Sequence, residues 1–118
     1  MSTAMLLPLS QIAHGRSGDK GNHANVAIIA YTEAGYRWLD ANLTAEFVHR
    51  HFAGLGTTRV ERFAAPNVLG FNFVLFDALA GGASQSLRSD TQGKSYALAL
   101  LAMLVELPAE HDEMLRVG

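Results

Sequence analysis

The chain of 118 residues contains no cysteine, and this absence excludes several classes of protein. Without cysteine there is no disulfide framework, no thiolate nucleophile and no cysteine-ligated metal. A chain of this length is expected to fold as one domain, residues 1–118, and to bury a hydrophobic core without cross-links. Lack of cysteine also fits a reducing compartment, so we expect a cytoplasmic protein.

Concentrated positive charge is lacking as well. The nine Lys and Arg residues are scattered, and the formal net charge is −2. Because nucleic acids and anionic membranes are bound by a concentrated positive field, we predict neither as a partner. The longest purely apolar run, from Ala97 to Val105, is too short to span a bilayer. The first residues carry no basic segment, so no signal peptide is predicted.

What the chain does contain is short apolar, β-branched segments interspersed with helical periodicity, which indicates an α+β domain. Thr32 and Thr44 are expected to cap two consecutive helices, because a threonine hydroxyl accepts a hydrogen bond from a first-turn amide. Pro66 and Asn67 indicate a turn between two strands. Strands are predicted over residues 5–13, 24–31, 58–65, 68–78 and, as a short strand, 85–88.

A last helix is predicted over residues 94–106, ended by Pro108. Every side chain from Ala97 to Val105 is apolar, so no face of this helix is left for water. We expect one side to pack on the sheet and the other on a second subunit, which predicts a homo-oligomer. The alternative is that the exposed side carries only alanines, which water tolerates.

The main candidate site is the segment from His14 to Asn25 (HGRSGDKGNHAN), which is predicted to be a glycine-rich loop. Glycines allow successive backbone N–H groups to turn inward, and such a concavity beside Arg and Lys suits a phosphate or a carboxylate. The segment lacks the Gly-Lys-Ser/Thr order of a nucleotide P-loop. An ordinary connection that needs glycine for its path is the alternative. Its candidate ligand-binding residues are Arg16, Ser17, Gly18, Lys20, Gly21 and Asn25.

Asn72 and Arg88 are added to this candidate site. Asn25 and Asn72 are amides within otherwise apolar strands, and a buried amide must be hydrogen-bonded. They either hold neighbouring backbone in place or face a ligand. Arg88 follows Gly81 and Gly82, where it either completes an anion site or is a solvated surface charge.

His14 and Asp19 are the candidates for acid–base catalysis, since a histidine titrates near neutral pH. With His23 they form an alternative three-ligand metal site. Their spacing matches no metal motif, so no metal and no other cofactor is predicted. No serine nucleophile is predicted either, because Ser17 does not sit in a G-x-S-x-G sequence.

Several separate motifs follow one another in an order that resembles a known family. They are RSGDKG with Asn25, then NFV from Asn72, the pair Gly81 and Gly82, and SLR ending at Arg88. Between Ile12 and Met103 the chain resembles the C-terminal domain of AtuA-type proteins, the acyclic terpene utilisation proteins linked to citronellol and geraniol catabolism.

The resemblance implies a ferredoxin-like α+β fold, with a mostly antiparallel sheet of four to five strands and helices on one face. Larger family members carry this domain after a large N-terminal domain, so it also implies a partner protein that contains that domain. We therefore expect an accessory or binding subunit in acyclic terpenoid and acyl-CoA catabolism. The alternatives are a small acid–base enzyme of hydratase, lyase or isomerase type, and a purely structural oligomerisation subunit.

Overall fold

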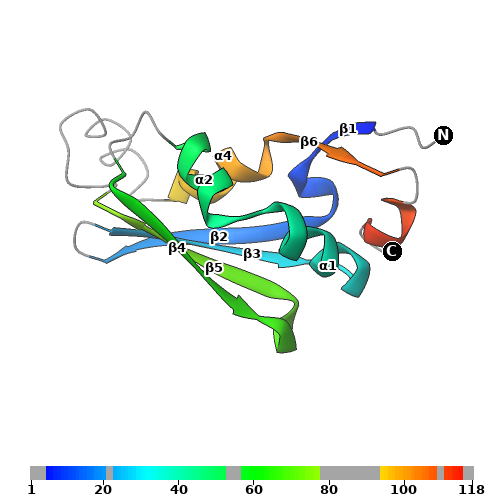
Figure 1. Ribbon diagram of the computed structural model, residues 1–118, viewed down its shortest axis with the longest axis horizontal. Helices are drawn as coiled ribbons and strands as arrows, with labels where there is room; N and C mark the ends of the chain where they lie inside the picture. Colours follow the sequence, from blue (N-terminus) through cyan, green and yellow to red (C-terminus); the bar gives the residue numbers. More distant parts are fainter. Residues whose placement is uncertain (1–4, 21–22, 53–56, 78–93, 109–110, 116–118) are drawn as a thin grey trace.

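A four-stranded antiparallel sheet is the centre of the computed structural model, which describes residues 5–20, 23–52, 57–77, 94–108 and 111–115. Its strands lie in the order β2-β3-β5-β4. The strands are β2 (Ala13–Lys20), β3 (His23–Ala30), β4 (Arg59–Ala65) and β5 (Gly70–Phe76). The helices α1 (Glu33–Asn42), α2 (Ala45–His51) and α4 (Lys94–Leu101) lie on one side of this sheet (Figure 1). This arrangement confirms the predicted α+β class.

The two faces of the sheet differ in burial, and the alternation along β3 shows this most clearly. Val26 and Ile28 are fully buried, whereas Asn25 and Ala27 between them are only half-buried. Successive side chains of a strand point to opposite faces, so one face packs under the helices and the other does not. The covered face holds the core side chains Phe71, Phe73 and Leu75 from β5. In the described part of the chain, no helix covers the second face, which we call the open face (Figure 1).

Both predicted helix caps are confirmed. The Thr32 hydroxyl accepts a hydrogen bond from the amide of Gly35 at 3.0 Å, at the start of α1. The Thr44 hydroxyl accepts one from the amide of Phe47 at 3.1 Å, at the start of α2. Each bond satisfies a first-turn N–H that the helix itself cannot pair, and contributes about 1 kcal/mol to stability.

The predicted helix over residues 94–106 is wrong in its second half. Helix α4 ends at Leu101, and the chain then forms β6 (Leu104–Leu107). Strand β6 pairs antiparallel with β1 (Met5–Pro8) in a separate two-stranded sheet. The uniformly apolar run carries no period, so the local sequence does not reveal where the helix gives way to a strand. That boundary is set by pairing with a segment about a hundred residues away, as the register Met5 to Leu107 shows.

The first predicted strand, residues 5–13, is divided by a short turn. Strand β1 ends at Pro8, and the 3-10 turn η1 (Leu9–Gln11) follows before β2 begins. A second 3-10 turn, η3 (Pro66–Val68), confirms the turn predicted between β4 and β5. It leaves Leu69 in the left-handed region at φ 59°, so β5 starts at Gly70 rather than at residue 68.

Near the chain end a third 3-10 turn, η5 (His111–Met114), lies beside α1 (Figure 1). The short strand predicted over residues 85–88 lies outside the described residues. None of the helices in the described ranges is long and apolar enough to cross a membrane.

The predicted glycine-rich loop is instead a β-hairpin. Residues 13 to 20 pair with β3 in continuous register, from Ala13 opposite Ala30 to Lys20 opposite His23. Gly15, within β2, serves strand packing rather than turning. A Cβ atom at Gly15 would collide with the carbonyl oxygen of Ala27, so this position admits only glycine without a backbone shift.

Candidate functional site

The register of the four strands places the candidate residues in rows across the open face. Arg16 of β2 is opposite Ala27 of β3, and Ala27 is opposite Asn72 of β5. Asn72 is in turn opposite Phe63 of β4, which completes a row across all four strands. A second row beside it runs through Gly18, Asn25, Val74 and Glu61.

A shallow cavity of about 260 Å³, open to solvent, lies where these two rows meet. Its residues come from β2, β3 and β5. They are Arg16, Ser17, Gly18, Asn25, Ala27 and Asn72. The cavity is smaller than the roughly 300–1,000 Å³ typical of sites that enclose a whole drug-sized ligand. It therefore has room for one functional group of a ligand, with the remainder lying on the surface.

The amides of Asn25 and Asn72 are joined inside this cavity, although the two residues are 47 positions apart. The Asn72 Nδ2 group donates a hydrogen bond to Asn25 Oδ1 at 3.2 Å. This bond occupies the acceptor oxygen of Asn25 and leaves its Nδ2 hydrogens as donors. The pair thus holds β3 to β5, as one of the two predicted roles requires, and it also lines a cavity.

Arg16 supplies the positive charge at the cavity. Its side chain is exposed, and among the described side chains no carboxylate is ion-paired with it. The other guanidinium on this face, that of Arg59, is already bound to Glu61 at 3.1 Å on the opposite edge strand. A guanidinium beside free amide donors favours an anionic group.

Ser17 has a structural contact that the sequence did not reveal. Its Oγ atom accepts a hydrogen bond at 3.2 Å from the amide of Ala97, in the first turn of α4. The hydroxyl therefore attaches α4 to β2, directly behind the cavity that Ser17 also lines.

The proposed acid–base residues are placed differently from the ligand-binding ones. His14 is exposed and stacks on Tyr31 with ring centroids 5.3 Å apart, and it does not line the cavity. Asp19 is opposite Ala24 in the hairpin register, and Lys20 is opposite His23. The side chains of Asp19 and Lys20, together with all of Gly21 and Arg88, lie outside what the structure describes.

The alternative metal site is excluded by the hairpin geometry. His14 is opposite Ile29, whereas His23 is opposite Lys20 at the other end of the two strands. Six residues of strand separate the two pairs, which corresponds to about 20 Å at the usual rise of a β-strand. The two histidines therefore cannot share one ion.

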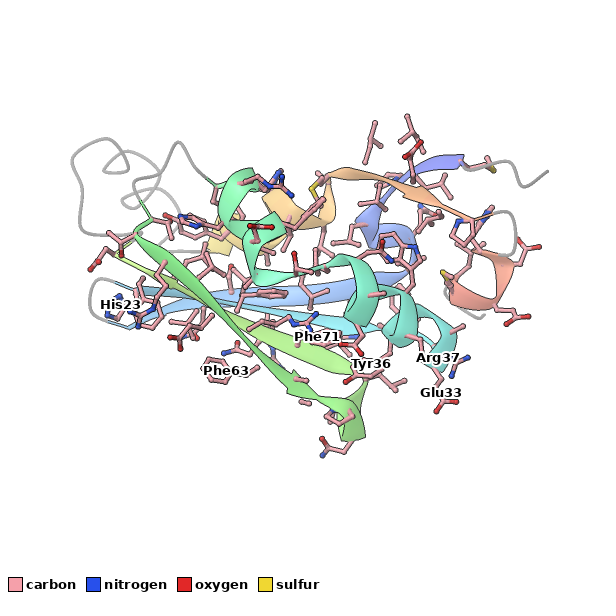
Figure 2. All side chains as sticks on the ribbon, in the orientation of Figure 1. His23, Glu33, Tyr36, Arg37, Phe63 and Phe71 are labelled. Carbon is pink, nitrogen blue, oxygen red and sulfur yellow. The ribbon has the colours of Figure 1, made fainter. Side chains whose placement is uncertain are left out.

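His23 belongs to a polar cluster that sequence reasoning missed. Its Nδ1 atom accepts a hydrogen bond at 2.9 Å from the amide of Asp77, which has a φ of 62°. The Thr58 hydroxyl donates to Asp77 Oδ2 at 2.7 Å, and the His23 ring meets the Phe76 ring edge-on. Figure 2 shows His23 at one end of the sheet. These contacts lie where β3 and β4 begin and β5 ends, and only the strand register reveals them.

The sequence also matches the profile of a known protein family. The sequence profile of the AtuA ferredoxin-like domain matches residues 7–106. The chain belongs to the AtuA ferredoxin-like domain family. The match confirms the resemblance drawn from the motifs between Ile12 and Met103, and the helix-covered antiparallel sheet agrees with a ferredoxin-like α+β fold. No curated protein and no solved structure matches this AtuA ferredoxin-like domain.

Proposed function

We propose that this AtuA ferredoxin-like domain is a cytoplasmic binding module, an accessory subunit in acyclic terpenoid and acyl-CoA catabolism. Its cavity on the open face accepts the anionic group of a metabolite. The observation that carries the proposal is the convergence of Arg16, Asn25 and Asn72 from three strands on one cavity. A protein with a large AtuA-type N-terminal domain is the partner that the family suggests.

The shape of the cavity favours binding over catalysis. A catalytic site excludes water and brings a base within hydrogen-bond reach of the reacting group. This cavity is shallow and open, and its described lining contains a guanidinium and two amides but no histidine or carboxylate. Amides and a guanidinium hold an anion without exchanging protons with it at neutral pH.

We also propose that the domain self-associates, for a reason other than the all-apolar helix that the sequence predicted. Leu98 on α4 keeps 66% of its surface exposed, and Leu104 on β6 keeps 58%. Large exposed side chains of this kind are found where a second subunit packs. Sedimentation of the wild type and of Leu98→Gln tests the proposal. A dimer that the substitution dissociates is the expected result, and a wild-type monomer at micromolar concentration refutes it.

An NMR titration of the full chain with acetate and inorganic phosphate tests the anion site. The side-chain NH₂ signals of Asn25 and Asn72 and the backbone amide of Gly18 should shift together as an anion enters the cavity. Arg16→Gln should weaken binding about tenfold or more, since a charge-assisted hydrogen bond is worth about 1.5–3 kcal/mol.

Arg37→Gln is the matched control for this titration. Arg37 is exposed on α1, where its ion pair is with Glu33 at 3.6 Å (Figure 2). It carries the same charge as Arg16 but lies away from the cavity lining. If Arg37→Gln and Arg16→Gln weaken anion binding equally, the effect is one of net charge and the proposed site is wrong.

A further inference from the structure

We propose that the ligand of this site is a monocarboxylic acid whose apolar chain lies across the open face of the sheet toward Phe63. The inference rests on the proposed anion site and adds the class of ligand. It is argued from three features of the open face: the donors at one edge, the low and partly apolar floor in the middle, and the Phe63 ring beside a closed ion pair at the far edge.

The donors at the first edge match a carboxylate in charge and shape. Arg16 provides one described positive charge and a planar set of N–H donors, and Asn25 provides amide N–H donors next to it. A carboxylate has one negative charge on two coplanar oxygens, which a guanidinium binds side by side. A phosphate carries up to two charges and three oxygens, so it calls for more positive charge than the described lining supplies.

The floor beside these donors is low and partly apolar. No atom lies within 4 Å of where a Cβ atom of Gly18 would be, so the space above this strand is open. In the neighbouring row, Ala27 lies next to Arg16 and offers only a methyl group, and Val74 borders Asn72 on the same face. An aliphatic chain leaving the carboxylate can lie on this floor without displacing a side chain.

Phe63 ends the row with an apolar surface that nothing described covers. It is 52% exposed, and Figure 2 shows it on the side of the sheet away from the helices. Three strand spacings separate it from Arg16, which is about 14 Å. An extended alkyl chain zigzags and advances about 1.3 Å per carbon, so about eight carbons cover roughly 10 Å, and van der Waals contact of about 3.5–4 Å with the ring covers the remainder.

Glu61 distinguishes a monocarboxylate from a dicarboxylate. It lies on the open face two residues before Phe63, opposite Val74, and it is paired with Arg59. Because the Arg59 guanidinium is already paired with Glu61, a second carboxylate at the far end of the ligand would find no unpaired positive charge among the described side chains of this edge. The charges of the face therefore complement a ligand that is anionic at one end and apolar at the other.

The experiment is a titration of the full chain with acetate, butanoate, hexanoate and octanoate, and with suberate, the eight-carbon dicarboxylate. Affinity should rise about twofold per methylene, half the factor expected for full burial, because the face is open on one side. Octanoate should therefore bind about 60-fold more tightly than acetate, since it has six more methylenes, and more tightly than suberate.

Two substitutions locate the chain on the surface. Phe63→Ser should lower octanoate affinity about fivefold and leave acetate binding unchanged. Val68→Ser is the control, because Val68 is also 52% exposed but lies in η3, outside the row. It should change neither affinity.

The outcomes separate this inference from the proposed function. If acetate and octanoate bind equally well and Arg16→Gln loses both, the proposal that an apolar chain contacts the open face is wrong. The anion site would still stand. Tighter binding of inorganic phosphate than of acetate would overturn the proposal that the ligand is a carboxylic acid, and it would also leave the anion site standing. An octanoate preference that Phe63→Ser does not reduce overturns the path across the sheet. Lack of binding by every acid and by phosphate overturns both proposals.

Discussion

Arg62 and Arg16 lie on opposite faces of the same sheet, and their contacts differ. On the covered face, Arg62 donates to the carbonyl oxygens of Asp40 and Leu43 at 3.1 Å, and it pairs with the Asp40 carboxylate at 3.2 Å. Its guanidinium also lies 4.7 Å from the centre of the Phe71 ring. Arg16 has no such partners among the described side chains. On the covered face Arg62 holds the fold together, whereas on the open face we propose that the charge of Arg16 serves a ligand.

The largest effect expected from this comparison is between two phenylalanines. Phe73→Ala empties a fully buried position on the covered face and should lower the free energy of unfolding by about 3–5 kcal/mol. Phe63→Ala removes an exposed ring from the open face and should change it by less than about 0.5 kcal/mol. Urea denaturation of the two variants measures both values. Comparable losses would mean that the open face is part of the core.

The two arginines provide the next test. Arg62→Ala removes three hydrogen bonds and should lower the free energy of unfolding by about 2–3 kcal/mol. The loss is smaller than for three fully buried bonds, because solvent screens the exposed part of the Arg62–Asp40 pair. Arg16→Ala should lower the free energy of unfolding by less than about 0.5 kcal/mol, while it weakens anion binding by about tenfold or more. Thermal unfolding together with the acetate titration distinguishes the two roles. A large stability loss in Arg16→Ala would assign this residue to the fold.

Two glycines of β2 sharpen the comparison further. Gly15→Ala should cost about 2 kcal/mol, because the new methyl group meets the carbonyl oxygen of Ala27 and the Ile28 side chain. Gly18→Ala has open space around the new atom and should leave stability unchanged or slightly higher. Denaturation curves recorded side by side check the difference. Equal destabilisation by the two substitutions would contradict the packing described for β2.

The smallest effect on stability is expected at Ser17 of β2, whose hydroxyl contacts α4 on the covered face. Ser17→Ala should cost about 1 kcal/mol, since it removes the acceptor for one helix amide. Hydrogen exchange at the Ala97 amide should become faster in this variant. Ser17→Thr retains the hydroxyl and serves as the control. Unchanged exchange in Ser17→Ala would show that the bond does not hold α4.

Much of the difference between the two faces of the sheet could be predicted from local sequence patterns. The caps at Thr32 and Thr44 and the buried strand β3 follow from residue types and spacing within a few positions. Alternation along β5 likewise places Phe71, Phe73 and Leu75 on one face, which is the buried one.

What the sequence left open depends on pairing between distant segments. β2 contains two glycines, which are unusual in strands, so their segment was interpreted as a loop. Its strand character comes from pairing with β3, and Gly15 is required by the close approach of the Ala27 carbonyl. The position of Phe63 beside the candidate site depends on register in the same way, because 47 residues separate it from Arg16 in the chain but only three strand spacings separate them in the sheet.

The most direct test of the open face as a binding surface is the affinity of Asn25→Asp for acetate and octanoate. The new carboxylate still accepts the hydrogen bond from Asn72, so stability should change by less than about 1 kcal/mol. It also replaces the amide donors with a negative charge beside Arg16. We predict that both acids lose at least tenfold in affinity while the protein remains folded. Undiminished binding of acetate and octanoate by a folded Asn25→Asp variant would contradict the account.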